Sequence, residues 1–302
     1  MVPKYDPRAM ALPSLVGGVF ILGFAAIFVK WAAAPGPVTA LYRMLIGSAV
    51  ITPFALIKRR RAGKALPGRG VLLAVVGGSL FGCDMAIWMT AVGISGATMP
   101  TLMANTAPLW VGLGALLIFR EKQTAGFWAG LLLAILGVGV VFSRGLGGVE
   151  RPVHGTALGL VAALFYASFY IATQEGRKHL DTLSYLWIST LGAAGALLVI
   201  NLILREPLVG YDSRTYLSFI ALGIVVQFLG WLFINYAQGY IRASVVAPTL
   251  LGQPVLTALL AIPLLGETLS PRHIAGGLIV LAGIYIVVWS RGRAWKARGG
   301  GT

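Results

Sequence analysis

The chain has 302 residues, of which 58% are hydrophobic and only 11% are charged. Soluble domains carry roughly 25% charged residues, so an ordinary soluble protein is excluded. The net charge of +15 does not indicate a nucleic-acid partner, because the basic residues cluster between long uncharged runs, as they do in membrane proteins.

Apolar runs, separated by glycine, proline and charged residues, predict ten membrane-spanning helices. A helix needs about 20 apolar residues to cross the hydrocarbon core. Free backbone groups find no partner in lipid, and these continuous runs lack the alternation of a membrane β-barrel. In chain order the predicted helices cover residues 11–31, 37–57, 70–93, 97–119, 124–143, 155–173, 182–203, 214–239, 243–265 and 271–289.

Basic residues occur at alternating ends of these helices. With the N-terminal tail inside, the loops after the second, fourth, sixth and eighth helices and the C-terminal tail are the basic ones, including "KRRR" at 58–61. Positive loops mark the cytoplasmic side, so both termini are predicted to be cytoplasmic. The first apolar segment lacks a convincing cleavage site and is interpreted as a retained helix.

A polar phrase occurs twice within the apolar runs. "PTLMAN" at residues 100–105 returns as "PTLLGQ" at 248–253. Further along, Pro108 and Glu121 recur as Pro254 and Glu267, 146 positions later. Such self-similarity predicts an internal repeat, with residues 1–150 as the first five-helix unit and 151–302 as the second. Because five is odd, the second unit must enter the membrane the other way up. Inverted repeats are typical of secondary transporters that work by alternating access.

Several stretches carry a resemblance to a known family. They are "ALYRMLIG" in the second helix, "PLWVGLGALLIFREK" in the fourth, "AGLLLAILGVGVV" in the fifth, and "PVLTALLAIPLLGETLSPRHIAGGLIVLAGIYIVV" over the last two. The chain resembles the EamA-type ten-helix members of the drug/metabolite transporter superfamily, and most of all the YddG-type exporters of amino acids, aromatic ones included. The resemblance implies a bacterial inner-membrane (plasma-membrane) protein. It also implies a central cavity lined by the third, fourth, eighth and ninth helices, with the first and sixth beside them and the fifth and tenth at the periphery.

Small residues in the fifth and tenth helices agree with a peripheral position. Glycines and alanines at such spacing let two helix backbones approach closely. We interpret the following residues as packing positions: Gly126, Gly130, Ala134, Gly137, Gly276 and Gly283.

Polar side chains in the ninth and fourth helices are candidates for substrate contact. Thr249, Gln253 and Thr257 follow each other at a spacing of four and share one helix face. Thr101 and Asn105 form the corresponding pair. Polar groups in lipid normally face the bundle interior. The alternative is that they only hydrogen-bond between helices or back onto their own helix.

Aromatic and small side chains supply further candidates for the substrate site. The sixth helix carries two aromatic pairs, Phe165 with Phe169 and Tyr166 with Tyr170, which pack against neighbouring helices or line the cavity. Ser79 and Cys83 lie in the third helix. Because Cys83 is the single cysteine, no intramolecular disulfide can form.

Two charges fall well inside predicted helices. Arg43 and Asp84 lie at depths of about 9 and 14 Å from the outer ends of the second and third helices, within one helical turn of each other. A charge in lipid is costly and tends to find a partner. We predict an Arg43–Asp84 ion pair in at least one conformational state. The rival interpretation is that Asp84 carries protons or binds an ammonium group of the substrate.

Enzymes and channels fit the sequence poorly. The three histidines lie apart, without a metal-binding spacing, and no P-loop or GxSxG motif is present. No cofactor or metal is expected, and no ring of charges suggests an ion channel. The predicted function is export of small net-neutral metabolites, above all amino acids, by a monomer. The alternative is another cargo, such as a cationic drug, a nucleobase or a nucleotide-sugar.

Overall fold

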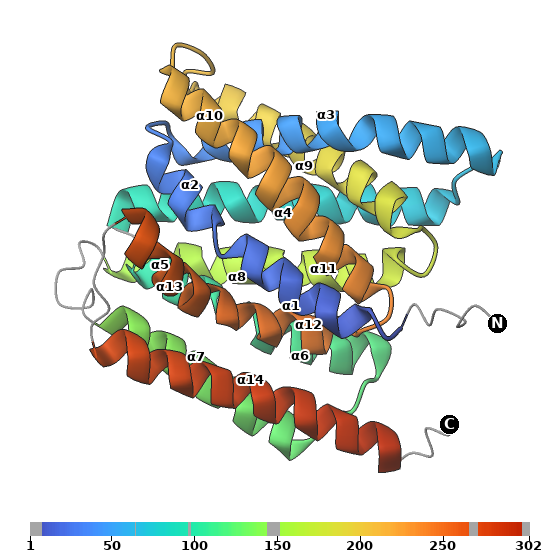
Figure 1. Cartoon of the computed structure of the whole chain (residues 1–302), viewed down its shortest axis with the longest axis vertical. Helices are drawn as coiled ribbons and strands as arrows, with labels where there is room; N and C mark the ends of the chain where they lie inside the picture. Colours follow the sequence, from blue (N-terminus) through green and yellow to red (C-terminus); the bar gives the residue numbers. More distant parts are fainter. Residues whose placement is uncertain (1–7, 64, 96–97, 144–151, 266–270, 298–302) are drawn as a thin grey trace.

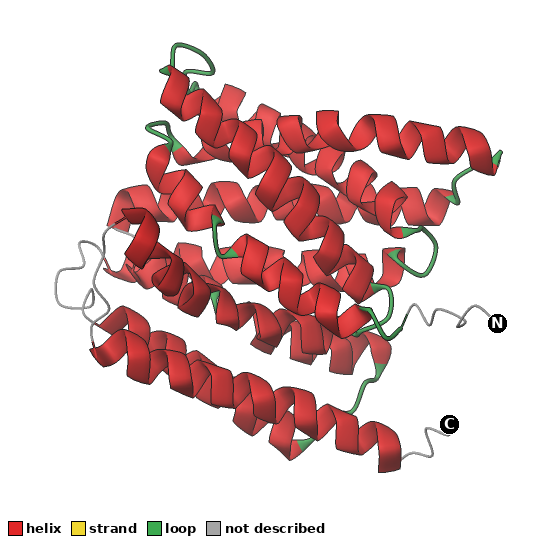
Figure 2. Cartoon of the chain, in the orientation of Figure 1, coloured by secondary structure: helices red, strands yellow, loops and turns green. Residues whose placement is uncertain are grey.

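Helices make up most of the chain. The computed structural model describes residues 8–63, 65–95, 98–143, 152–265 and 271–297, and within these ranges helices alternate with loops and there is no strand (Figure 2). The first half contains α1 (Ala11–Leu22), α2 (Ala25–Trp31), α3 (Gly36–Ala62), α4 (Gly68–Ser95), α5 (Thr98–Ala104), α6 (Ala107–Phe119) and α7 (Ala125–Phe142). The second half contains α8 (Pro152–Gly176), α9 (Thr182–Leu204), α10 (Ser213–Ala221), η2 (Leu222–Gly230), α11 (Trp231–Gln238), α12 (Ala243–Thr249), η3 (Leu250–Gly252), α13 (Gln253–Leu265) and α14 (Pro271–Ala297).

Among the described residues, eight helical segments are long and apolar enough to cross a membrane, and they coincide with eight of the predicted spans. The fifth and tenth predicted spans contain shorter apolar stretches, at 125–141 and 274–290. Lipid-facing surfaces are apolar as well: Leu117, for example, is 77% exposed. The chain is therefore an all-helical, multi-pass membrane protein.

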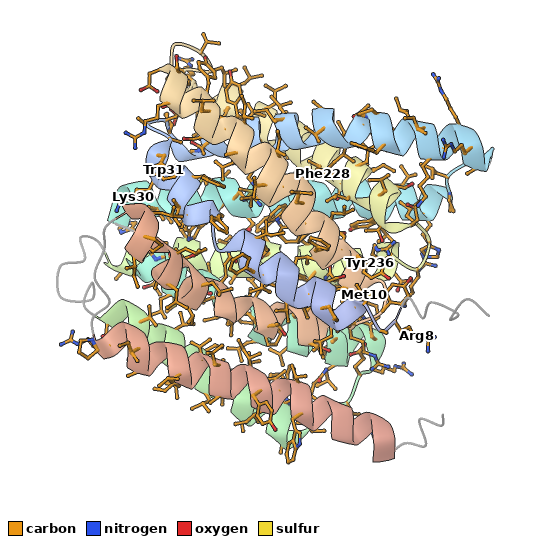
Figure 3. All side chains as sticks on the ribbon, in the orientation of Figure 1. Arg8, Met10, Lys30, Trp31, Phe228 and Tyr236 are labelled. Carbon is orange, nitrogen blue, oxygen red and sulfur yellow. The ribbon has the colours of Figure 1, made fainter. Side chains whose placement is uncertain are left out.

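The helices run side by side across the molecule, and α1 begins at the same end at which α14 finishes (Figure 1). Arg8 lies at this end, whereas Lys30 and Trp31 lie at the opposite end (Figure 3). The loop between α3 and α4, which follows the basic run, also lies at the first end (Figure 1). We call this end of the molecule, where α1 begins and α14 finishes, the basic end.

Helices α7 and α14 pack closely at one edge of the bundle (Figure 1). A Cβ added to Gly130 would lie 2.8 Å from the backbone oxygen of Gly283, and one added to Gly137 would lie 2.8 Å from that of Gly276. Each of these glycines therefore holds a close backbone approach that a larger residue would prevent. The predicted packing role of these four glycines is confirmed.

Helix α4 lies at the centre of the helix contacts, against both α8 and α9. The contact with α9 depends on small residues: a Cβ on Gly78 would lie 1.9 Å from the carbonyl oxygen of Ser189. The pairs α4–α9 and α4–α8 each join one helix from each half, and exchanging the halves turns them into two other observed pairs. Helix α3 packs on η2 as α9 packs on α4, and α1 packs on α11 as α8 packs on α4.

Both copies of the repeated polar phrase lie where a helix is interrupted. Helix α5 ends at Ala104 and α6 begins at Ala107, so Asn105 falls in the break. In the second half, the 3-10 turn η3 separates α12 from α13, and Gln253 is the first residue of α13. Proline lacks a backbone N–H and disturbs the preceding turn of a helix. Pro108 and Pro254, each just after a break, explain why both helices are interrupted there.

The approach of α4 to α9 yields a stability prediction. Gly78→Ala forces a methyl group against the backbone at Ser189, and such overpacking costs about 1–3 kcal/mol. The matched control is Gly195→Ala, because a Cβ on Gly195 meets nothing within 4 Å. We expect Gly78→Ala to lower the melting temperature of the detergent-purified protein by several degrees and Gly195→Ala to leave it unchanged or slightly higher. Equal melting of both variants would contradict the close approach.

Candidate functional site

Aromatic side chains from three helices meet inside the bundle. The ring of Phe81 in α4 lies 4.6 Å from Phe169 in α8 and 4.9 Å from Trp231 in α11, centroid to centroid. Tyr166 stacks on Phe81 at 5.9 Å and accepts a hydrogen bond of 2.8 Å from the Tyr170 hydroxyl. We call these five residues the aromatic cluster. They offer flat apolar surface together with hydroxyl groups.

Arg43 of α3 reaches the edge of the aromatic cluster. It is 9% exposed, and its guanidinium carbon lies 5.9 Å from the centroid of Phe81. Its Nε donates a hydrogen bond of 3.1 Å to Oε1 of Gln227, and Nε2 of Gln227 donates to Thr190 at 3.2 Å. Gln227 lies in η2, a π-helical stretch. Such wider turns are rare and occur frequently at functional sites, where they redirect side chains.

Asp84 lies one turn beyond Phe81 on the same face of α4. It is 8% exposed, and it forms no hydrogen bond or ion pair with any residue that the structure describes. The charges of Asp84 and Arg43 act on each other, but their charged atoms are not within the ion-pair distance of 4.0 Å. The ion pair predicted from the sequence is absent from this conformation, because Gln227 positions the guanidinium. For another conformation it stays a prediction.

The space beside the aromatic cluster is small in this conformation. A cavity of about 10 Å³ lies between Phe81, Phe169, Thr190, Gln227, Trp231 and Asn235. This volume suits about one water molecule and no metabolite. The indole nitrogen of Trp231 is buried without a hydrogen-bond partner among the described residues. The aromatic cluster therefore leaves no room for a metabolite in this conformation, and the indole nitrogen of Trp231 can still donate a hydrogen bond.

The polar stripe of the ninth predicted helix is used for helix contacts in this conformation. Gln253 donates from Nε2 to the carbonyl oxygen of Leu22 at 3.0 Å, and Thr257 donates to that of Gly23 at 2.9 Å. These carbonyls lie where α1 ends, at the break before α2. Thr249 bonds back to Val245 on its own helix at 2.8 Å. The substrate role of the three residues stays a prediction.

The fourth-helix pair makes similar local bonds. Asn105 donates from Nδ2 to the carbonyl oxygen of Thr101 at 2.7 Å, and the Thr101 hydroxyl accepts from the indole nitrogen of Trp88 at 3.2 Å. Trp88 shares a face of α4 with Phe81 and Asp84. Thr101 is thus linked to the side of α4 that carries the candidate site.

Three other sequence candidates lie outside the aromatic cluster. Ser79 points to α9 and donates to the carbonyl oxygen of Gly192 at 3.4 Å. Cys83 is a free, half-buried cysteine next to Asp84. Phe165 is half-buried and contacts none of the described rings, so of its predicted pair only Phe169 joins the cluster.

Glu121 joins three helices at the basic end. Its carboxylate is buried, accepts hydrogen bonds from Gln174 at 3.1 Å and Ser244 at 3.2 Å, and lies 3.5 Å from a guanidinium nitrogen of Arg242. Gln174 in turn accepts a bond of 2.6 Å from the backbone N–H of Ala243, where α12 begins. Beside this Glu121 network lies a cavity of about 450 Å³. Its predicted counterpart Glu267 lies outside the described residues.

The loop after α8, also at the basic end, is held by a second acidic residue. Asp181 caps α9 by accepting from the backbone of Leu183 at 3.1 Å, and it pairs with Lys58 at 2.8 Å. Burial raises the pKa of Asp181, but the hydrogen bonds from Lys58 and Ser184 outweigh it and hold this pKa below its usual value. The carboxylate therefore stays charged and fixes the loop to α3.

Gln227, Thr190 and Trp231 were not among the residues singled out from the sequence. Gln227 stands alone in the apolar run "LGIVVQFLGW", and the rule that singled out Asn105 applies to it equally. Thr190 lacks the polar stripe that singled out Thr249 and Thr257, because Leu186 and Ala194 lie four residues before and after it. Nothing in the sequence distinguishes Trp231 from the other tryptophans of the chain.

A multi-pass helical bundle with a closed polar and aromatic site inside has the architecture of a membrane transporter. Comparison with known proteins agrees. The sequence pattern of the EamA-like transporter family matches residues 9–143 and again residues 154–289. The chain belongs to the EamA-like transporter family.

Individual relatives share about a fifth to a third of their residues with this chain over the aligned regions. A probable amino-acid metabolite efflux pump of Salmonella typhimurium is 31% identical over 188 residues, which span 59% of this chain and 62% of that protein. The pseudopaline exporter CntI of Pseudomonas aeruginosa is 25% identical over 90% of this chain and 96% of its own length. A solved crystal structure with 19% identity superposes with a TM-score of 0.80 over 94% of this chain and 98% of its own. That likeness shows the shared fold.

The bonds at the α1 break yield a second prediction. Thr257→Val keeps the shape of the side chain but leaves the carbonyl of Gly23 without its donor, which costs about 1–3 kcal/mol when the group is buried. Thr249→Val is the matched control, because its hydroxyl bonds only within its own helix. We expect Thr257→Val to melt at a lower temperature than Thr249→Val in detergent. Unchanged melting together with weaker substrate transport would instead assign Thr257 to substrate contact.

Proposed function

We propose that this protein is a secondary transporter that exports small net-neutral metabolites, chiefly amino acids including aromatic ones, across the bacterial inner membrane. One observation carries the proposal: the aromatic cluster lies beside two buried opposite charges, Arg43 and Asp84, whose sum is zero. Aromatic walls favour an apolar or aromatic side chain. A net-neutral interior favours a net-neutral cargo. The name of the Salmonella relative supports the same substrate class.

Other cargoes fit the described interior less well. A nucleotide-sugar carries phosphates that call for several cations, and here the guanidinium of Arg43 has a carboxylate nearby. A cationic drug calls for an excess of negative charge, and Asp84 is offset by Arg43. A nucleobase would gain from stacking but not from the two charges.

The mechanism in this proposal is alternating access between two inverted halves. Two features support it: the family pattern matches twice, and the helix pairs between the halves recur with the roles of the halves exchanged. In this proposal α7 and α14 complete ten crossings, both termini lie in the cytoplasm, and the protein works as a monomer. The Glu121 network then closes the cytoplasmic end, because it ties α6 and α8 of opposite halves to the start of α12.

The orientation can be tested with two cysteines in a chain whose Cys83 is replaced by serine. Val209→Cys places one cysteine in the exposed loop between α9 and α10. Ala62→Cys places the other at the last residue of α3, at the basic end. We expect a membrane-impermeant maleimide to label residue 209 in intact cells and residue 62 only after permeabilisation, because positive loops stay inside. The reverse labelling would overturn the proposed orientation.

Transport by the purified protein tests the function itself. We expect proteoliposomes to take up labelled phenylalanine and leucine above the level of protein-free liposomes, since both are net neutral and have apolar side chains. Parallel assays with a nucleobase, a cationic drug and a nucleotide-sugar compare the other cargoes. Each assay is run with and without a proton gradient, which shows whether protons are coupled. Uptake of one of those cargoes and of no amino acid would refute the proposed substrate class.

A further inference from the structure

Arg43 and Asp84 are buried without being satisfied by the protein. A buried charge is strongly unfavourable unless it is paired and hydrogen-bonded. Asp84 has no hydrogen-bond or ion-pair partner among the described residues, and Arg43 uses only Nε, towards Gln227. Its terminal Nη atoms donate to none of the described groups. Both side chains therefore have unused capacity for charged partners.

The surroundings hold the guanidinium in one orientation. Gln227 accepts from Nε at 3.1 Å and is itself fixed by the hydroxyl of Thr190 at 3.2 Å. Thr190 is anchored in turn to the carbonyl oxygen of Leu186 at 2.7 Å. A guanidinium fixed through Nε keeps its Nη atoms for another acceptor. A carboxylate is the acceptor whose geometry fits such a fork.

Aromatic surface lies between and beside the two charges. Arg43 lies over Phe81, and Asp84 follows Phe81 by one helical turn. Both charges act on the Tyr166 hydroxyl as well. The two poles and the aromatic cluster thus form one continuous region, contributed by α3, α4, α8, η2 and α11.

We propose that Arg43 and Asp84 are the two poles of a single site for a zwitterion, in which the guanidinium binds the substrate's carboxylate and Asp84 binds its ammonium group. The side chain of the substrate then lies against the aromatic cluster. This inference rests on the proposed function and narrows it to molecules that carry both charged groups. It also explains why the two residues are close but do not neutralise each other by direct contact.

Analogues of one substrate separate the two poles. Phenylalanine carries both charged groups, 3-phenylpropionate lacks the ammonium group, and phenethylamine lacks the carboxylate. We measure each as a competitor of labelled phenylalanine uptake in proteoliposomes. We expect the wild-type protein to prefer phenylalanine over each analogue by about 10- to 100-fold, because each analogue leaves one buried charge unmatched.

Substitution of one pole removes one of these preferences. Asp84→Asn is expected to weaken the binding of phenylalanine about 10- to 100-fold and to weaken the binding of 3-phenylpropionate little. Arg43→Gln is expected to weaken the binding of phenylalanine by a similar factor and to weaken the binding of phenethylamine little. The ratio of two competitors within one variant does not depend on how much protein reaches the membrane. Asp84→Glu and Arg43→Lys keep the charges and serve if the neutral variants do not fold. The control is Thr90→Val on α4, whose hydroxyl bonds only to Ala86, and it should leave all ratios unchanged.

The double variant Arg43→Gln/Asp84→Asn separates a substrate site from a structural pair. If the two residues bind the substrate, phenylalanine transport by the double variant falls at least as far as in each single variant, since both contacts are lost. A bracing ion pair predicts recovery, since no charge is left unpaired. Recovery, or analogue ratios that stay unchanged in both single variants, would overturn the two-pole site while amino-acid transport by the wild type still stood. A wild type that carries no amino acid would overturn the proposed function as well.

Discussion

The centre of this transporter depends on two opposite charges that are buried near each other but kept from direct contact. Arg43 is drawn to Gln227 in the π-helical η2, whereas Asp84 stands one turn beyond Phe81 on α4. Because α3 and α4 belong to the first half and η2 to the second, the separation of the charges depends on how the halves sit against each other. A shift of η2 would release Arg43 toward Asp84. In the proposed alternating-access mechanism, a rearrangement of the halves would free Arg43 from Gln227.

Lipid imposes a second condition, because every interrupted helix needs donors and acceptors from its neighbours. The break after α1 receives Gln253 and Thr257 from α13, and the beginning of α12 receives Gln174 from α8. The bonds of Gln253 and Thr257 connect the two halves, whereas the bond of Gln174 lies within the second half. In the proposed alternating-access mechanism, a rearrangement of the halves must exchange the two bonds that connect them, which favours a few discrete conformations over a continuous range.

Much of the fold follows from the sequence, since apolar length, proline and glycine act locally. The runs of apolar residues predicted the eight long apolar helices, and the glycine spacing predicted close backbone packing of the fifth and tenth predicted helices. The repeated phrase lies at both helix breaks, although the sequence predicts a continuous helix in each case. The site was harder to predict. Counting along α3 and α4 placed Arg43 and Asp84 at similar depths, but the rotation of each helix about its axis decides which side chains meet. The direction of the Gln227 side chain depends on the π-helical stretch η2, which no local pattern indicates, and so the pairing of Arg43 with Gln227 was missed. Because helix rotation is not set locally, Phe169 could not be told from Phe165 either.

The most direct measurement is the distance between a bound substrate and Asp84 by solid-state NMR. The chain has four aspartates, at positions 6, 84, 181 and 212, so ¹³C-labelled aspartate gives few signals and Asp84→Asn identifies the relevant one. With ¹⁵N-labelled phenylalanine bound, the account predicts dipolar coupling between the ammonium nitrogen and the Asp84 carboxylate carbon at about 4 Å, the range of an ion pair. Specific binding of phenylalanine without any coupling to Asp84 would contradict it.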